Sequence, residues 1–146
     1  MVAIRLLKTW GGESLSRELE SAQEKVLAIL PEESRRKAEQ TRIYAPDIAM
    51  QPHSRSGFDA IHQAISAQRV LGLHYRDESG QLSSRNVQPL GLFFWGEHWL
   101  LAAWCERRDD YRCFRLDRCL NITMTDRRFS ESADRSLADF LRKVKQ

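Results

Sequence analysis

Arginines are the residues of this chain whose type and spacing point most directly to chemistry. The stretch YRCFRLDRC, residues 111–119, holds Arg112, Arg115 and Arg118 among aromatic and apolar neighbours. Between Arg107 and Arg118 there are five arginines and no lysine. The guanidinium group is a planar fork that pairs with phosphate or carboxylate, whereas lysine carries a point charge. The pattern therefore predicts a site for an anion.

Other polar and aromatic residues on neighbouring predicted strands extend this site. Guanidinium groups that are held close together repel one another, and a bound anion relieves that repulsion. A histidine and a tyrosine at the end of a strand would add a hydrogen bond and a stacking face, as in many sites for single-stranded nucleic acid. The expected ligand-binding residues are Arg85, Arg112, Arg115, Arg118, His74 and Tyr75.

The same charges also have a structural explanation, which the sequence leaves open. Asp117 lies between Arg115 and Arg118, so either arginine could form an internal salt bridge that fixes a turn. Asp117 itself is expected to be structural. The arginines at 107–108 adjoin two aspartates and are expected to be solvated. Large aromatic side chains are expected in the core rather than in a stacking platform, namely Trp99, Trp104 and Phe114.

Catalytic and metal-binding patterns are absent from the sequence. The serines at 83–84 have no histidine and acid signature around them, and no phosphate-binding loop or HExxH motif occurs. His74 has no second histidine at ligand spacing. The cysteines form no CxxC pair, so we expect buried thiols at Cys105, Cys113 and Cys119. The prediction is a protein that is not an enzyme and needs no metal or cofactor.

Length and composition are those of an ordinary globular domain. The chain has 146 residues, 42% hydrophobic and 29% charged, which suits one compact domain with a helical extension. A net charge of +3 is too small to imply nucleic-acid binding by itself. No apolar run approaches the roughly 20 residues that cross a bilayer, and no signal peptide is visible. A cytoplasmic protein with no membrane partner is expected.

Residues 1–57 are expected to form a helical connector. Gly11 and Gly12 should end a first helix, a second should cover about 13–30, and a third should begin at Pro31. A short strand is expected at 41–46 and a linker at 47–57. The second helix carries an apolar stripe that either pairs with a second copy of the chain or covers the chain's own sheet. For a homodimer, the contact residues would be Leu15, Leu19 and Val26.

The sequence pattern from residue 58 onward predicts an α+β fold. Ser56-x-x-Asp59 is a helix-capping signature, so a helix is expected over 58–68. Five short strands follow, at 70–75, 82–95, 99–105, 111–115 and 119–126, with Leu120, Ile122 and Met124 pointing inward. Pro89 and Gly91 should bend the second strand, and residues 116–118 should form a single turn. This order predicts a small five-stranded Sm/SH3-like β-barrel over 58–130 and a C-terminal helix over 131–146.

Four motifs resemble the WYL domain, an Sm-like or SH3-like barrel of many bacterial transcriptional regulators. A helix leads into VLGLHY, Arg85 precedes VQPLGL, and HWLLAAWC occupies the strand that names the family. The stretch RCFRLDRCLNI resembles the family's arginine signature, and Phe129 matches its closing aromatic residue. The naming Trp-Tyr-Leu reads Trp-Leu-Leu here at 99–101, so a ligand contact from that tyrosine hydroxyl is not carried over.

The resemblance implies a ligand-sensing domain of a bacterial transcriptional regulator. Such domains bind effectors, often nucleic acids or nucleotide-like anions, and pass the signal to DNA binding. Residues 1–57 are too short for the winged helix-turn-helix usual in the family, so DNA contact is expected only through a missing N-terminal domain. Two alternatives remain: a free-standing Sm-like protein that binds single-stranded nucleic acid, and a purely structural dimerisation module.

Overall fold

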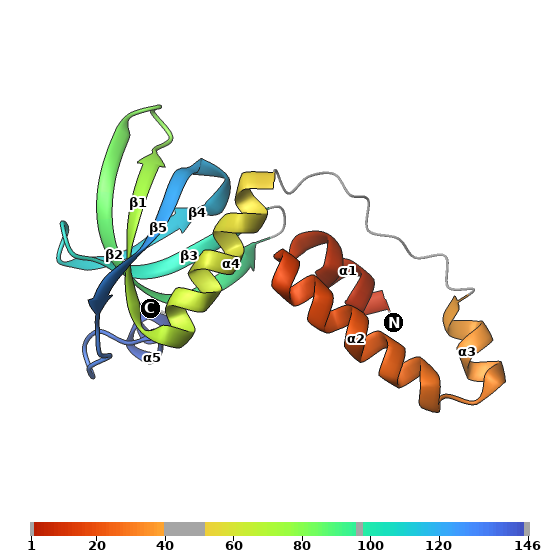
Figure 1. Ribbon diagram of the computed structural model, residues 1–146. Coiled ribbons are helices and arrows are strands. Elements are labelled where there is room, and N and C mark those ends of the chain that lie inside the picture. The colour runs from red at the N-terminus through yellow and green to blue at the C-terminus, as the bar shows by residue number, and fades with distance from the viewer. Residues whose placement is uncertain (1, 40–51, 96–97, 145–146) are drawn as a thin grey trace. The chain divides into compact units, whose positions relative to one another are not determined.

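The computed structural model describes residues 2–39, 52–95 and 98–144. The chain divides into two compact units, Met1–Asp59 and Ala60–Gln146. The first unit is helical, and the second contains the sheet (Figure 1). None of the described helices combines the length and the apolar character that crossing a bilayer requires.

The first unit contains α1 (Val2–Trp10), α2 (Glu13–Ile29), α3 (Glu32–Glu39) and the start of α4 (Pro52–Ala67). The first three helices lie where the sequence predicts them. Two contacts join α1 to α2: Ser16 Oγ donates to the Lys8 carbonyl at 3.1 Å, and Lys8 Nζ lies 2.7 Å from a Glu20 carboxylate oxygen. The strand expected at 41–46 lies outside the described residues.

The N-terminus of α2 is capped by a carboxylate from α4. The backbone N–H groups of Glu13 and Ser14 donate to Asp59 Oδ2 at 3.0 and 3.4 Å. A Cβ atom on Gly12 would overlap the Asp59 carboxylate, so this close approach requires a glycine. The expectation that Ser56-x-x-Asp59 marks the start of this helix is wrong, because α4 begins at Pro52 and already includes both residues. The last part of the expected linker is therefore helical.

The apolar stripe of α2 is uncovered along the second half of the helix. No residue of α2 is buried. Leu15 and Leu19 are half-buried, whereas Val26 is 42% exposed and Ile29 is 82% exposed. Most of the hydrophobic surface that the sequence pattern predicts is thus in contact with solvent.

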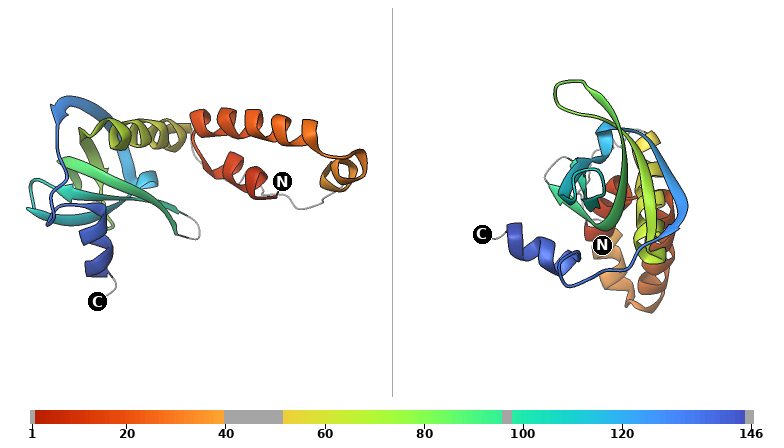
Figure 2. Two further views of the ribbon diagram at one scale, coloured as in Figure 1. Left: turned by 90° about the horizontal axis from the view of Figure 1, so that it is seen from below. Right: turned by 90° about the vertical axis from the view of Figure 1, so that its left-hand side faces the viewer.

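The second unit is built on a five-stranded sheet with the order β4-β3-β2-β1-β5. Every neighbouring pair of strands is antiparallel. The sheet curls around one of its faces, here called the inner face (Figure 2). The strands are β1 (Arg69–Arg76), β2 (Leu82–Trp95), β3 (His98–Cys105), β4 (Asp110–Arg115) and β5 (Cys119–Arg128), with the 3-10 turn η1 (Leu116–Arg118) between the last two.

The sheet is open, so the expected closed barrel is not confirmed. β4 and β5 lie at its two edges and pair only with β3 and β1 respectively. The bend predicted for β2 is present, because the register with β3 shifts between Pro89 and Gly91. A Cβ atom on Gly91 would come within 3.2 Å of Phe93 and 3.3 Å of Leu137, so tight packing explains this glycine.

Both faces of the sheet carry a hydrophobic core. On the inner face the buried side chains include Leu71, Leu73, Val87, Leu101 and Phe114. On the opposite face, here called the outer face, α5 (Leu137–Val144) covers β3 and β4. The outer cluster consists of Val70, Leu90, Ala102, Trp104, Tyr111, Phe129 and Phe140. Burial on both faces explains why β3 is apolar throughout its length.

Two expectations for the C-terminal part are wrong. Leu120 and Met124 were expected to point into the core, but they are 49% and 39% exposed. β5 is an edge strand with two register irregularities against β1, which explains their exposure. The last helix begins at Leu137 rather than near 131, because residues 132–135 form a turn. Ser136 Oγ then accepts a hydrogen bond from the Asp139 N–H at 3.2 Å and caps α5.

Candidate functional site

The residues predicted to bind a ligand divide between the two faces of the sheet. Successive side chains of a strand point to opposite faces. Tyr75 and Arg85 share the inner face with Leu73, because Arg85 lies opposite Leu73 in the β1–β2 ladder. His74 therefore points to the outer face. The side chains of His74 and Tyr75 thus leave opposite faces of β1, although both residues line one hollow of about 290 Å³.

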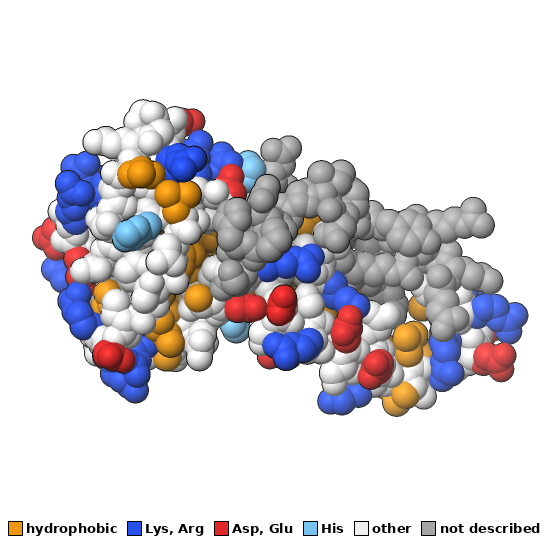
Figure 3. Space-filling view, turned by 45° about the horizontal axis from the view of Figure 1, so that its top comes forward, with side chains coloured by type: hydrophobic (Ala, Val, Ile, Leu, Met, Phe, Trp, Pro, Cys, Tyr) orange, Lys and Arg blue, Asp and Glu red, His pale blue; other side chains and the backbone are white. Residues whose placement is uncertain are grey.

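Arg112 and Arg115 are likewise separated. They lie three positions apart on β4, so their side chains leave opposite faces of the strand. Arg112 is exposed, and its Nη1 lies 3.2 Å from Asp110 Oδ2. On the face shown in Figure 3, Lys and Arg side chains are spread around the sheet rather than gathered in one patch.

Arg115 is held by a carboxylate two residues away. Its Nε and Nη2 donate to the two oxygens of Asp117 at 3.0 and 2.7 Å. These bonds hold the pKa of Asp117 below its ordinary value and raise the pKa of Arg115. His98 Nε2 lies 2.8 Å from Arg115 Nη2, and since a guanidinium can only donate, this nitrogen accepts. The salt bridge that the sequence left open for Arg115 is present, and it fixes η1.

Arg118 has a looser partner. Its Nη2 lies 3.6 Å from a Glu78 oxygen, which is too far for a hydrogen bond. The Glu78 side chain is 89% exposed, whereas that of Arg118 is 27% exposed. An exposed carboxylate at this distance contributes little binding energy. An incoming anion can therefore replace Glu78 at small cost.

Arg85 differs from the other candidate arginines because no carboxylate of the described residues pairs with it. Its Nε donates to Ser83 Oγ at 3.2 Å. Its Nη1 is buried and has no hydrogen-bond partner among the described residues. A buried polar group without a partner costs free energy of folding, and the cost is higher for a charged group.

Tyr75 closes the inner face beside Arg85. Arg85 donates to Ser83, and Ser83 lies opposite Tyr75 in the β1–β2 ladder. The Arg85 side chain is therefore directed toward Tyr75. The Tyr75 hydroxyl accepts a hydrogen bond from the Arg115 N–H at 3.4 Å. Its ring meets Phe114 edge to face, with the centroids 5.2 Å apart. Tyr75 thus positions the end of β4 at this site.

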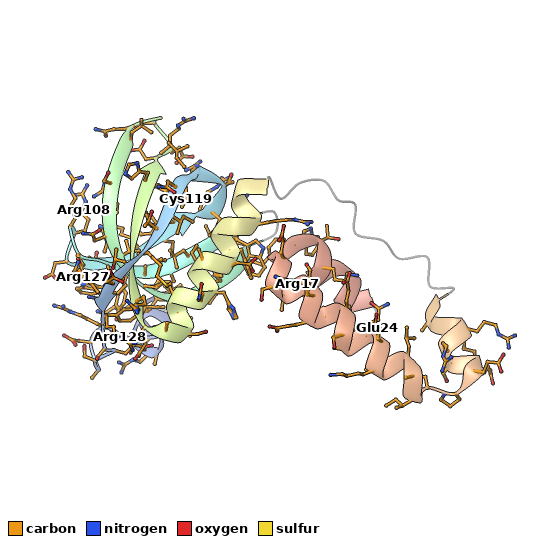
Figure 4. All side chains as sticks on the ribbon, viewed as in Figure 1. Arg17, Glu24, Arg108, Cys119, Arg127 and Arg128 are labelled. Carbon is orange, nitrogen blue, oxygen red and sulfur yellow. The ribbon has the colours of Figure 1, made fainter. Side chains whose placement is uncertain are left out.

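The cysteines near the site are not suited to nucleophilic chemistry. Cys119 lies within the sheet unit (Figure 4) and opposite Tyr75 in the β1–β5 ladder. Burial raises the pKa of Cys119 to about 12, so the thiol stays protonated near neutral pH. Cys105 is buried as expected, whereas Cys113 is exposed. Among the described residues, no three His, Cys, Asp or Glu side chains lie together as a metal site.

Sequence reasoning missed His98 and Ser83 as neighbours of these arginines. The β3–β4 hairpin places Leu100 opposite Arg115, and His98 lies two positions along the same face. The register of the β3–β4 hairpin, counted from its turn, would have indicated that His98 lies near Arg115. Ser83 shares a face with Arg85 because two positions separate them on one strand.

The second unit is thus an open, curled five-stranded antiparallel sheet preceded by a helix, with arginines on β2 and β4. Residues 57–124 match the family model described as "WYL domain". The chain therefore contains a WYL domain, as the four motifs predict.

Two similar proteins extend this finding. An uncharacterized HTH-type transcriptional regulator of Bacillus subtilis (strain 168), YobV, is 26% identical over 113 residues, which are 75% of this chain and 36% of that protein. The proteasome accessory factor B/C (PafBC) of Arthrobacter aurescens has a structure that matches with a TM-score of 0.53 and 34% identity. That match covers 58% of this chain and 13% of PafBC. The chain spans about a third of its curated relative, and its WYL domain is of the kind found in transcriptional regulators.

Proposed function

We propose that this chain is the effector-binding, regulatory part of a bacterial transcriptional regulator, and that its effector is an anion held by Arg85. The observation that carries the proposal is that the buried Nη1 of Arg85 has no hydrogen-bond partner in residues 2–39, 52–95 and 98–144. A phosphate or carboxylate oxygen at this position would accept the missing hydrogen bond. Charge-assisted bonds of this kind are about twice as strong as neutral ones.

The other arginines take different parts in this proposal. Arg118 supplies a second contact, because an anion can displace the exposed Glu78 carboxylate. Arg115 stays bound to Asp117, and only its backbone N–H reaches the Tyr75 hydroxyl beside the site. Arg112 takes no part, because it is exposed and paired with Asp110. The expected set thus narrows to Arg85 and Arg118.

The WYL domain and the chemistry of Arg85 both support a proposal for the effector class. A guanidinium fork on a rigid strand suits a phosphate of single-stranded nucleic acid or of a nucleotide. The proposed role is recognition, and none of its steps makes or breaks a covalent bond. The response in DNA binding would then depend on whether this site is filled.

The test is a titration of the protein with short single-stranded DNA, short single-stranded RNA and a cyclic dinucleotide. We expect at least one probe to bind, and Arg85→Ala to weaken it by about tenfold or more, the loss of one charge-assisted bond. Arg85→Lys should recover part of the affinity, because it restores the charge without the fork. Arg112→Ala removes the same charge from an exposed pair and serves as the control.

Unchanged binding of every probe by Arg85→Ala would overturn the proposal. If such binding were also insensitive to sequence and fell steeply with salt, contacts to phosphate spread over the surface would explain it. That result would favour the alternative of a free-standing protein that binds single-stranded nucleic acid.

We also propose that the apolar stripe of α2 pairs with a second copy of the chain, through Leu15, Leu19 and Val26. No α2 residue is buried, and Ile29 on the same stripe is 82% exposed. A small residue, Ala22, lies at the middle of the stripe, where two antiparallel helices would cross. Pairing about that point brings Lys25 of one copy near Glu18 or Glu20 of the other, so the charges are complementary.

Light scattering of Leu19→Glu tests this pairing. We expect the mass to fall from dimer to monomer while the circular dichroism of the helices is retained. Arg17→Glu is the matched control, because it adds an acid to the exposed side of the same helix (Figure 4). An equal mass for both variants and the wild type would exclude α2 as the interface.

A further inference from the structure

We propose that the outer face of β1, β2 and β5 carries a second ligand site, which takes the edge of a neutral heterocyclic ring such as a nucleobase. Two hollows of about 300 and 290 Å³ adjoin on this face and share His74 and Ser84. Together they form a groove, here called the outer groove. Arg85, Tyr75 and Ser83 also line these hollows, but their side chains leave the opposite face of the strands, so we propose the outer groove as a site separate from the anion site.

Gly72 forms the floor of the outer groove, and the fold does not require a glycine there. A Cβ atom at Gly72 would meet nothing closer than the Thr123 carbonyl at 3.8 Å and Asn86 Oδ1 at 3.9 Å, which are ordinary contacts. Gly91 in the same sheet differs, because a Cβ atom there would come unusually close to the side chains of Phe93 and Leu137. A glycine inside a strand costs roughly 0.5–1 kcal/mol relative to alanine, and it often marks a place where a ligand approaches closely.

The side chains at one end of the outer groove are neutral and polar. The ladders place Asn86 and Thr123 on either side of Gly72, and Ser84 and Asn121 on either side of His74. Arg85 is the one Asp, Glu, Lys or Arg residue among those that line this end, and its side chain leaves the opposite face of β2. Each carboxamide offers a donor and an acceptor side by side. That pairing matches the edge of a nucleobase and gives a charged ligand no counterion.

The other end of the outer groove is apolar. Leu82 and Leu120 line it, and they are 62% and 49% exposed. The exposure of Leu120, which contradicts its expected place in the core, gives the groove a hydrophobic wall. His74 lies between the polar and apolar ends and lines both hollows. A flat ring can cover the leucines and His74 with its faces while its edge reaches the carboxamides.

Nuclear magnetic resonance titration of the isotope-labelled protein with uncharged ribonucleosides tests this site. The probes are adenosine, guanosine, cytidine and uridine, none of which carries a phosphate. We expect at least one to shift the backbone signals of Gly72 and His74 and the carboxamide signals of Asn86 and Asn121, with saturation. Absence of saturable shifts with every nucleoside would overturn the proposal.

Two variants distinguish the outer groove from other surfaces. Gly72→Val fills the floor, and its affinity for the nucleoside should fall at least about tenfold, the effect of one lost close contact. Asn121→Leu removes a carboxamide from an exposed position, so it remains informative if Gly72→Val does not fold. Wild-type affinity in the folded variants would also overturn the proposal.

Arg85→Ala separates this inference from the anion site. Nucleoside binding should be unchanged in Arg85→Ala, and oligonucleotide binding through Arg85 should be unchanged in Gly72→Val. Loss of nucleoside binding in Arg85→Ala would show that the outer groove is not an independent site. An oligonucleotide that shifts the same groove signals would identify the base as part of a strand, and a response to nucleosides alone would identify a free nucleoside.

Discussion

Two regions of the sheet carry arginines, and they compensate the charge differently. In the β4–η1 segment each candidate arginine has a carboxylate within 4 Å: Arg112 with Asp110, Arg115 with Asp117, and Arg118 with Glu78. In the middle of β2, Arg85 donates to a serine hydroxyl, and its buried Nη1 has no partner within the part of the chain that the structure describes. The three arginines that lie close together in the sequence each have a nearby carboxylate. Arg85, which lies apart from them, has no carboxylate partner among the described residues.

This difference shows that a cluster of arginines in the sequence does not by itself indicate arginines that are available to bind an anion. The aspartates at 110 and 117 lie within the same short stretch as the arginines and neutralise two of them. The Arg115–Asp117 pair also connects the end of β4 to the η1 turn. An anion site instead needs a cation whose neighbours leave it unsatisfied.

The largest expected effect comes from replacing Arg85 with methionine. A buried donor without an acceptor costs about 1–3 kcal/mol, and Arg85→Met keeps the apolar stem while removing the donor. The free energy of unfolding should therefore rise by up to about that amount, measured by urea denaturation. Arg115→Met should change it in the opposite direction, because Asp117 loses its partner. If the free energy of unfolding decreased in both variants, Arg85 and Arg115 would not differ in the way proposed here.

A second prediction concerns a buried charge that is fully paired. Asp139 is 8% exposed and accepts a bond from the Tyr111 hydroxyl at 2.8 Å. Arg142 and Lys143 also lie 3.0 Å from its carboxylate. Tyr111→Phe should lower the free energy of unfolding by about 1–2 kcal/mol, because a bond to a buried charge is lost. Thermal denaturation checks this, and Phe140 packing should keep the variant folded. An unchanged midpoint would show that α5 is held by packing alone.

A third prediction uses the pH dependence of the Arg115–Asp117 pair. Arg115 holds the pKa of Asp117 below its ordinary value of 3.8. The pair therefore contributes stability above about pH 4, and this contribution is lost as the pH falls through the lowered pKa. Asp117→Asn should reduce the stability near neutral pH by less than about 1 kcal/mol, since the pair is partly exposed. Once the pH has fallen below the lowered pKa of Asp117, the variant and the wild type should converge in urea denaturation, and a difference that stays constant with pH would contradict the assignment.

The smallest effect is expected for Arg112→Ala. Both side chains of the Arg112–Asp110 pair are about half exposed, at 51% and 54%. The free energy of unfolding should change by less than about 0.5 kcal/mol, and anion binding should not change. Urea denaturation and the oligonucleotide titration measure the two quantities. A marked loss of oligonucleotide binding in Arg112→Ala would show that Arg112 belongs to the anion site.

Much of the fold could be predicted from local patterns. The bend at Pro89 and Gly91, the single turn before β5 and the first three helices all depend on residues near one another in the sequence. The cap of α2 could not be predicted, because Asp59 reaches it from 46 positions away. The openness of the sheet escaped prediction because pairing between β4 and β5 depends on curvature, which no local pattern specifies.

The candidate site was predictable in its residue types but not in its geometry. Alternation along β4 already separates Arg112 from Arg115, and the same rule separates His74 from Tyr75. The burial of Arg85 Nη1 depends on the packing of the inner face, so no count of charges could indicate it. The outer groove depends on Gly72 and on the exposure of Leu120, which needed the register of β5.

The open edges of the sheet have a consequence for behaviour at high concentration. An edge strand presents backbone N–H and C=O groups that can pair with the edge of another molecule and start aggregation. β5 ends in Asp126, Arg127 and Arg128, and all three are exposed. Charged side chains along such a strand are a common protection against intermolecular pairing. The charges at the end of β5 thus keep an unclosed sheet from growing into a larger one.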